Sequence, residues 1–258
     1  MASIDLPVPA RALAVGAHPD DVEFGAGATL AKWAAAGCEV SLVICTDGSK
    51  GTWDPSADLA ELVTTRQEEA RAAARALGAT GEVVLLGRVD GELENDRATR
   101  SELARWIRQL RPDVLLGHDP WQRYRLHPDH RAAGFLVTDS LVAARDPHFF
   151  PEHASAHHRP SVLLLFEADE PDHAEAVEAP HVDAKLAALE SHRSQYESTM
   201  FIPSPDGPED GRPTGGADRD PSAEHERFRA EVRAGLANAG VWAGVDLAER
   251  FRLVPTDR

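Results

Sequence analysis

The chain of 258 residues has few of the features that mark secreted or membrane proteins. It has only two cysteines, Cys38 and Cys45, and their spacing around one predicted strand fits neither a zinc pair nor a disulfide framework. The segment Met1 to Ala10 lacks a basic head followed by an apolar run, so no signal peptide is expected. No apolar stretch approaches the length of a membrane helix. We therefore expect a cytoplasmic protein with buried free thiols and no membrane partner.

Basic side chains are also scarce. The chain has 43 acidic and 27 basic residues, for a formal net charge of -16. Binding to a polyanion requires clustered lysine and arginine, and the arginines here are scattered over predicted helices. The composition therefore predicts no nucleic-acid partner. With 42% hydrophobic and 27% charged residues it is typical of a globular protein with a substantial core.

Short apolar runs alternate with longer helical stretches along most of the chain. The predicted strands, which contain almost no polar residues, are 11–17, 39–46, 82–86, 113–118 and 161–166. The predicted helices between them are 26–36, 59–77, 98–109 and 129–144. Apolar strands separated by helices are typical of a mostly parallel sheet that is covered on both faces. The handedness of such crossovers then predicts a Rossmann-like, doubly wound α/β fold.

A segment of different composition lies near the C-terminus. Residues 203–221 are rich in proline, glycine and aspartate and contain no apolar side chain larger than alanine, which predicts a mobile surface loop. The stretch 223–255 that follows contains another predicted helix and a short strand at FRLV. There is no internal repeat. We expect one domain over residues 1–258.

Two clusters of polar residues follow predicted strands. The sequence AHPDD at 17–21 comes directly after the first strand, and HPDH at 127–130 follows the fourth strand where a helix begins. Ligands of doubly wound folds bind outside the carboxyl ends of the strands. Because these two strands are expected to be neighbours in the sheet, the clusters are expected to meet and form a metal site.

The residue types in the two clusters suit zinc-dependent hydrolysis. A catalytic zinc needs three nitrogen or oxygen ligands and one open position. His18, Asp21 and His130 would supply this set, which leaves Asp20 and His127 for proton transfer and charge stabilisation. Such ligands discriminate poorly among divalent ions, so Fe²⁺ or Co²⁺ would also fit.

The same residues resemble the motifs of a known family. AHPDD, followed by EFGAGATL at 23–30, is similar to the opening signature of the LmbE-like (PIG-L) zinc-dependent de-N-acetylases, and HPDH is similar to their second metal motif. Further matches lie at 46–48 (TDG), Arg66, Glu69, 90–91 (DG) and 185–195 (KLAALESHRSQ). The resemblance implies a hydrolase that removes the N-acetyl group from an N-acetylglucosamine-type amino sugar or its conjugate and releases acetate and free amine. Its partner would be this small molecule, and assembly into a homo-oligomer stays open.

The resemblance also implies a role for each matched position. Asp20 matches the general base. His127 matches the histidine that stabilises the developing oxyanion and that can also protonate the leaving amine, and Asp129 matches the carboxylate that orients this histidine. The zinc ligands that it implies are His18, Asp21 and His130.

Three polar residues at predicted strand ends or on the second helix are expected to contact the sugar. Arg66 and Asp90 match substrate-contacting positions of the family, and Asp47 lies at the same edge of the sheet. The alternative for Arg66 is a surface pair with Glu69 on one helix face, at positions i and i+3.

One position departs from the family pattern. Some members carry a tyrosine two residues before the first histidine of the second motif, where this chain has Arg125, and the nearest tyrosine is Tyr124. Arg125 is expected either to contact an anionic group of the substrate or to lie in a solvated loop.

Other functions stay open at this point. A dinucleotide-binding protein would use Gly25-x-Gly27 with Asp47, but Leu30 replaces the third glycine, and the AHPDD cluster separates the strand from the glycines. A non-catalytic metal-binding module would keep the fold, although the matched general base argues for catalysis. Within the amidases, a thiol-conjugate amide or an N-acyl glycopeptide is an alternative substrate.

Overall fold

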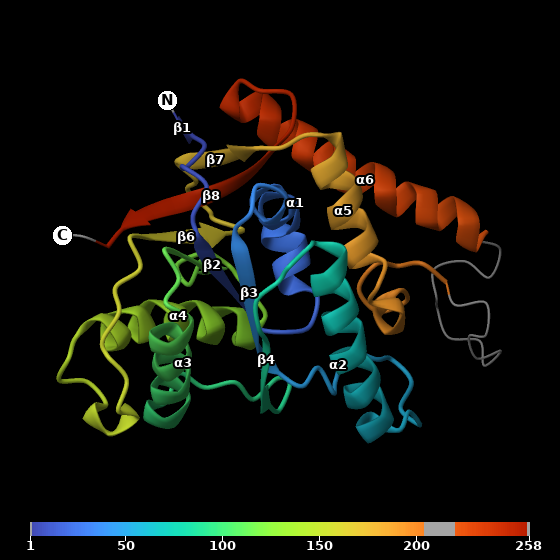
Figure 1. The fold of residues 1–258 in the computed structure, drawn as a ribbon. Coiled ribbons are helices and arrows are strands. Elements are labelled where there is room, and N and C mark those ends of the chain that lie inside the picture. Colours follow the sequence, from blue (N-terminus) through green and yellow to red (C-terminus); the bar gives the residue numbers. More distant parts are fainter. Residues whose placement is uncertain (1, 204–219, 257–258) are drawn as a thin grey trace.

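The computed structural model describes residues 2–203 and 220–256 of the chain, and its central element is a mixed sheet (Figure 1). The eight strands lie in the order β1-β7-β8-β6-β5-β2-β3-β4, and only β8 runs antiparallel to its neighbours. Their bounds are β1 Ser3–Ile4, β2 Arg11–Gly16, β3 Glu39–Thr46, β4 Val83–Arg88, β5 Val114–His118, β6 Val162–Phe166, β7 His173–Ala176 and β8 Ala248–Pro255.

The direction of winding reverses between β2 and β5. From β2 the chain proceeds through β3 and β4 toward one edge of the sheet, and it then crosses back to β5 and β6 on the other side of β2. The connections after β2 and β5 therefore lead away in opposite directions and leave a crevice at the carboxyl ends of these two strands. The doubly wound, mostly parallel fold predicted from the sequence is confirmed.

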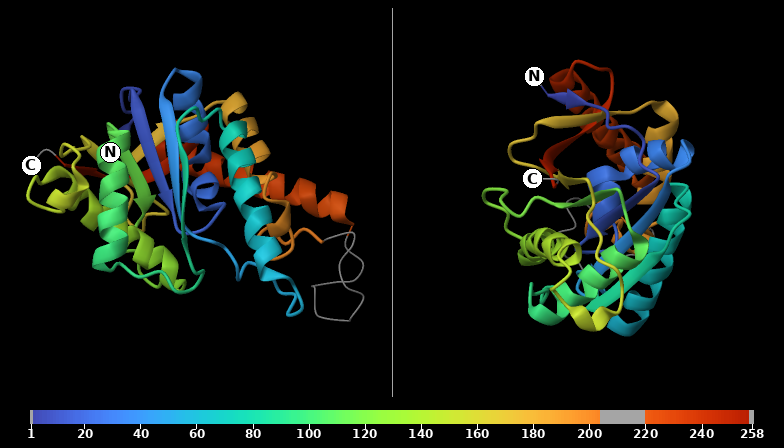
Figure 2. Two further views of the ribbon diagram at one scale, coloured as in Figure 1. Left: turned by 60° about the horizontal axis from the view of Figure 1, so that its bottom comes forward. Right: turned by 60° about the vertical axis from the view of Figure 1, so that its left-hand side comes forward.

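Helices cover both faces of the sheet (Figures 1 and 2). Helices α1, α2 and α5 lie on one face, α3 and α4 lie on the other, and α6 packs along β8. The alternation of side chains along β2 explains the two cores, since Leu13 and Val15 pack with α3 and α4, whereas Ala12 and Ala14 pack with α1. The helix bounds are α1 Asp21–Ala35, α2 Leu59–Ala76, α3 Arg97–Leu110, α4 Pro128–Arg145, α5 Ala179–Leu189 and α6 Pro221–Ala243.

The predicted elements agree with the structure apart from the start of α1, and α5, β1 and β7 were not predicted. Helix α1 begins at Asp21, five residues before the predicted start at residue 26, because acidic residues occupy its first turn and favour a helix N-terminus. Strands β1 and β7 were not predicted, since two and four residues are too few for a readable alternation. The predicted C-terminal helix and strand are present as α6 and β8, and the antiparallel direction of β8 was not foreseen.

Of the segment 203–221, for which the sequence predicts a mobile loop, residues 204–219 lie outside the described part of the chain. The described chain resumes at Asp220, whose side chain accepts a hydrogen bond from the backbone N–H of Ser222 and so caps α6.

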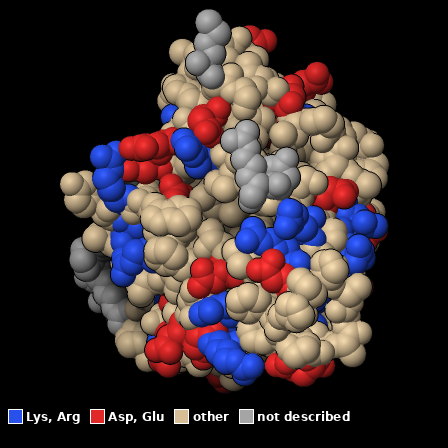
Figure 3. Space-filling view, turned by 90° about the vertical axis from the view of Figure 1, so that its left-hand side faces the viewer, with Lys and Arg blue, Asp and Glu red and all other residues tan. Residues whose placement is uncertain are grey.

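The surface carries both signs of charge. On the face shown in Figure 3, lysine and arginine side chains lie beside aspartate and glutamate side chains, and neither sign forms one continuous field. Among the helices of residues 2–203 and 220–256, none has both the length and the hydropathy that crossing a membrane would require.

Candidate active site

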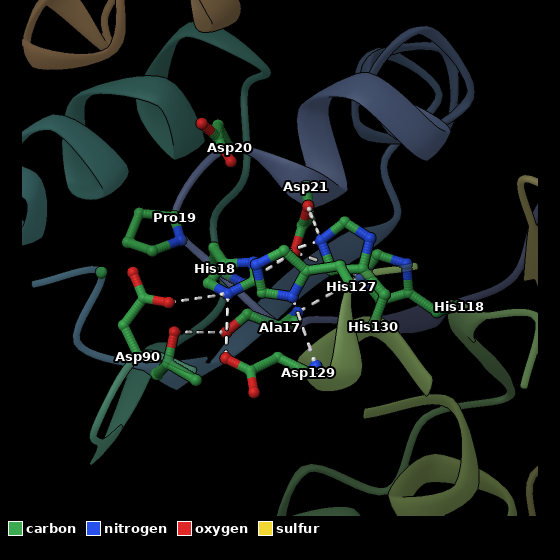
Figure 4. Close-up of polar contacts among 12 residues, drawn as sticks. Ala17, His18, Pro19, Asp20, Asp21, Asp90, His118, His127, Asp129 and His130 are labelled. Atoms are coloured by element: carbon green, nitrogen blue, oxygen red, sulfur yellow. Dashed lines mark hydrogen bonds and ion pairs between the residues drawn. The ribbon is translucent and has the colours of Figure 1, made fainter. Parts of the chain in front are cut away.

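The two polar clusters meet at the crevice between β2 and β5 (Figure 4). The first follows Gly16 and opens α1, and the second begins α4. The imidazoles of His18 and His130, from the two clusters, lie with their ring centres 5.1 Å apart. A cavity of about 550 Å³ opens over this point, which is within the range of small-molecule sites, roughly 300–1,000 Å³. The expectation that the two clusters meet is confirmed.

Two imidazole nitrogens and one carboxylate group of the clusters form a triangle, in which Asp21 presents a different oxygen to each histidine. His18 Nδ1 lies 3.2 Å from Asp21 Oδ2, His130 Nε2 lies 3.3 Å from Asp21 Oδ1, and the two histidine nitrogens are 3.2 Å apart. A tetrahedral ion with bonds of about 2.0–2.1 Å holds its ligand atoms roughly 3.3–3.4 Å apart. The two histidine nitrogens therefore have nearly the separation of two zinc ligands, and the Asp21 carboxylate lies beside both of them.

Carboxylates behind His18 hold its ring in place. Its Nε2 lies 3.1 Å from Asp129 Oδ2 and 3.3 Å from Asp90 Oδ1, so that Nδ1 faces the other two vertices of the triangle. Burial lowers the pKa of His18, but hydrogen bonds to Asp129 and Asp21 outweigh this and raise the pKa to about 12. A carboxylate on the second ring nitrogen is the usual support of a metal-ligating histidine.

The contacts of Asp129 differ from the sequence expectation. From the sequence, its carboxylate is expected to orient His127, but it instead accepts hydrogen bonds from the backbone N–H of Gly91 at 2.6 Å and of Leu93 at 3.2 Å, and it contacts His18. Only the backbone N–H of Asp129 reaches His127, at 3.3 Å from Nδ1. The reason is that His127 is the extended N-cap of α4, while Asp129, in the first turn, is fully buried.

The electrostatic surroundings of His127 favour a neutral ring. Burial lowers its pKa, and the neighbouring imidazoles of His18 and His130 lower it further. Because Nδ1 accepts a hydrogen bond, the neutral ring carries its proton on Nε2. His127 can therefore donate one N–H bond to a ligand oxygen.

Asp20 occupies a strained and buried position next to α2. Its φ of 116° lies in the left-handed region, and its carboxylate points toward α2 in Figure 4. Arg66 Nη2 is 3.4 Å from Asp20 Oδ2 and donates to the carbonyl of Pro19 at 2.6 Å, and Nη1 donates to the carbonyl of Gly48 at 2.9 Å. Burial raises the pKa of Asp20 to about 6, although Arg66 acts in the opposite direction. At neutral pH Asp20 is a carboxylate that can take up a proton.

The contacts of Arg66 exclude the surface-pair alternative. Its side chain is buried, and a Cβ on Gly48, whose φ is +68°, would lie 2.6 Å from the guanidinium. Glu69 instead accepts hydrogen bonds from the backbone and hydroxyl of Ser194. Arg66 therefore belongs to the site and not to the helix surface.

The three residues predicted to contact substrate have different positions. Among the described residues, those that line the cavity include Arg66 and Asp90 but not Asp47. Asp47 Oδ1 accepts hydrogen bonds from the backbone N–H groups of Ser49 at 3.0 Å and Asp90 at 3.1 Å. Asp47 therefore links the loop after β3 to the loop after β4, and it contacts the cavity-lining residue Asp90 rather than the cavity itself.

Three side chains at the site were not identified as a group from the sequence. His118, at the end of β5, has its Nε2 at 3.2 Å from Asp21 Oδ2 and its Nδ1 at 3.1 Å from Glu167 Oε2. Arg125 donates to Glu167 and lies 2.9 Å from His130 Nδ1, so it is neither solvated nor unpaired. The sequence did contain a signal for two of these residues. His118 ends β5 and Glu167 directly follows β6, and polar residues at the carboxyl ends of neighbouring parallel strands are expected at the same edge of the sheet.

The glycines considered for dinucleotide binding serve helix packing. Gly25 lies inside α1, where a Cβ would come within 2.5 Å of the Phe166 ring. A phosphate-binding turn would place such glycines between the strand and the helix. The dinucleotide alternative is therefore wrong for this segment.

A family model, two relatives and a solved structure that resemble the chain are described as de-N-acetylases or deacetylases. Residues 13–141 match the family model described as PIG-L, GlcNAc-PI de-N-acetylase. The chain is 33% identical to a diacetylchitobiose deacetylase of Thermococcus kodakarensis over 194 residues, which are 74% of this chain and 72% of that protein. It is 37% identical over 168 residues to a 1D-myo-inositol 2-acetamido-2-deoxy-alpha-D-glucopyranoside deacetylase of Streptomyces avermitilis, covering 55% and 56% of the two chains. The crystal structure of N,N'-diacetylchitobiose deacetylase from Pyrococcus horikoshii superimposes with a TM-score of 0.79 at 29% identity, covering 96% of this chain and 84% of that one.

Proposed function

The chain belongs to the PIG-L family of GlcNAc-PI de-N-acetylases, and from this premise we propose that it hydrolyses the N-acetyl group of an N-acetylglucosamine-type amino sugar or its conjugate. The observation that carries the proposal is the triangle of His18, Asp21 and His130, with edges of 3.2–3.3 Å, at the floor of a cavity that Asp20 also lines. These are the ligand geometry and the basic group that hydrolysis of an amide by a metal-assisted route requires.

We propose zinc as the ion that His18, Asp21 and His130 hold. Bound there, it would supply a Lewis acid that polarises the amide carbonyl and makes water more acidic. Two imidazoles and one carboxylate are a common ligand set for catalytic zinc, and they would also accept Fe²⁺ or Co²⁺.

Two further side chains have separate roles, Asp20 in proton transfer and His127 in hydrogen bonding to the oxyanion. Asp20, with a pKa of about 6, is mostly ionised at neutral pH and accepts the proton of the attacking water. The same carboxyl group, once protonated, is acidic enough to return that proton to the departing nitrogen. His127, whose pKa is lowered, acts as a neutral N–H donor to the oxyanion of the tetrahedral intermediate.

Polar side chains that line the cavity suit a sugar. Asp90 offers carboxylate oxygens to sugar hydroxyls and Lys50 offers an ammonium, while Arg66 and Gln195 line the same cavity with N–H groups that donate to backbone carbonyls. A glucosamine ring has hydroxyls on most of its carbons, and each needs a partner when it leaves water. The names of the relatives from Thermococcus and Streptomyces support the same substrate class.

The direct test is acetate release from a panel of substrates. We expect release from at least one of N-acetylglucosamine, N,N'-diacetylchitobiose and an N-acetylglucosaminyl inositol, loss of release with a chelator, and recovery when zinc is returned. An N-acetylated amino acid without a sugar serves as the control and should stay intact. Release only from a thiol-conjugate amide or a glycopeptide would refute the sugar assignment, and release from none of these compounds would refute the hydrolase.

Replacement of Asp90 by alanine should lower kcat/KM on the best sugar substrate well over tenfold. The variant loses the oxygens that we assign to sugar hydroxyls, while His18 keeps its contact with Asp129. Because His18 also loses its contact with Asp90, kcat/KM is measured at saturating zinc, where zinc occupancy and Tm should stay near those of the wild type. The matched control is Glu94→Ala, an exposed acidic residue four positions along the same loop. An unchanged kcat/KM for Asp90→Ala would reduce Asp90 to a turn-forming residue.

A further inference from the structure

Glu167 lies directly after β6 in a backbone conformation that side-chain-bearing residues seldom adopt. Its φ is +54°, in the left-handed region. The turn around it is held from both sides, since the backbone N–H of Asp119 donates to the carbonyl of Phe166 at 3.2 Å and the N–H of Asp169 donates to Asp119 Oδ2 at 3.3 Å. Such a conformation persists only where its surroundings enforce it, and here it brings the Glu167 carboxylate to the wall of the active-site cavity.

Two chains of contacts lead from this carboxylate to the metal-ligand triangle. Glu167 Oε2 lies 3.1 Å from His118 Nδ1, and His118 Nε2 lies 3.2 Å from Asp21 Oδ2. The same oxygen accepts a hydrogen bond from Arg125 Nη2, and Arg125 Nη1 lies 2.9 Å from His130 Nδ1. Because Asp21 and His130 also contact each other at 3.3 Å, the five side chains form a closed ring of polar contacts.

His118 and Arg125, the two side chains that connect Glu167 to the metal-ligand residues, are tightly packed. His118 is 1% exposed, and its imidazole lies between the stacked ring of His130, with centres 4.5 Å apart, and the edge-on ring of Phe166 at 4.6 Å. The Arg125 side chain is 14% exposed. The Glu167 side chain itself is 36% exposed, so the restraint on Asp21 comes from the buried His118 ring.

The negative charge of Glu167 also balances the positive charge of Arg125. Arg125 carries a permanent positive charge beside His130, and a cation placed there without a counter-charge repels a divalent ion in the triangle. A carboxylate can only accept hydrogen bonds, so Glu167 accepts one from Nδ1 of His118 and thereby holds the ring with its Nε2 3.2 Å from Asp21 Oδ2. The balance of charge around Arg125 favours cation binding at the triangle.

We propose that Glu167 is a positioning residue of the metal site, which sets the affinity for the ion by holding Asp21 through His118 and by pairing with the Arg125 cation beside His130. This inference rests on the proposed function, because it takes Asp21 and His130 as metal ligands. It assigns to Arg125, the position that departs from the family pattern, a place between Glu167 and a ligand.

The test is the zinc affinity of Glu167→Gln in the absence of any substrate, measured by competition with a chromophoric chelator. Glutamine keeps the size of the side chain but loses the charge, and we expect zinc binding to weaken about 10–100-fold, as loss of an outer partner of a metal ligand typically does. Glu170→Gln is the matched control, since this neighbouring side chain is 79% exposed and pairs only loosely with Arg123, at 3.9 Å. It should bind zinc like the wild type.

A titration with Co²⁺ gives a second readout, because the visible absorption of the bound ion reports the geometry of its ligands. We expect an altered spectrum for Glu167→Gln and the wild-type spectrum for Glu170→Gln. If the glutamine variant does not fold, Glu167→Asp replaces it, with the same direction expected because its carboxylate is withdrawn from His118 and Arg125. Zinc affinity of a folded Glu167 variant within twofold of the wild type would overturn this inference alone. A wild-type protein that binds no zinc would overturn the proposed function with it.

Discussion

Asp20→Asn should lower kcat by at least about a hundredfold, and the protein should still bind its zinc. The amide of asparagine has nearly the shape of the carboxyl group but cannot accept the proton of the attacking water. The ligand triangle does not include Asp20, whose contacts are with Arg66 on α2, so metal affinity should change little. Single-turnover rates and elemental analysis of the same preparation would separate the two effects.

The pH profile of the wild type provides a further check on the same residue. Burial raises the pKa of Asp20 to about 6, and a general base works only when it is deprotonated. Activity should therefore be present above pH 6 and should fall as the pH decreases through this value. Asp183→Asn, on the exposed face of α5, is the control and should keep the wild-type rate and profile. Near wild-type turnover of Asp20→Asn would rule out the assigned base.

His130→Ala should remove most of the zinc and with it the activity. The change deletes one vertex of the triangle, and neither Asp21 nor His18 can replace a nitrogen that lies 3.2–3.3 Å from both. The loss of zinc affinity should exceed the roughly 10–100-fold expected when only an outer partner is lost. It should therefore exceed the loss in Glu167→Gln.

Elemental analysis after dialysis, together with a chelator competition, would measure this loss. His157→Ala, an exposed histidine far along the chain, is the matched control and should retain full zinc. Full zinc occupancy in His130→Ala would exclude His130 from the ligand set and would transfer the third position to another histidine of the cluster, such as His127 or His118.

The sequence by itself determined the elements of the sheet and the identity of the central side chains. Short, β-branched apolar runs such as 39–46 favour buried strands, and the structure gives this strand the same bounds, Glu39–Thr46. Because the carboxyl ends of neighbouring parallel strands share one edge, AHPDD and HPDH were expected to meet, and they do. These inferences needed only local patterns and the rules of strand order.

Only the tertiary structure decided which atoms face one another. The Asp129 carboxylate contacts His18, 111 residues away in the sequence, whereas the sequence alone suggested the nearby His127. Arg125 is held by Glu167 rather than by solvent or substrate, and the backbone of Glu167 adopts a left-handed conformation that no residue type announces. Periodicity and propensity describe a few consecutive residues. The direction of a side chain at a strand end depends instead on the turn that follows and on the side chains packed against it from distant segments, and these are known only once the chain has folded.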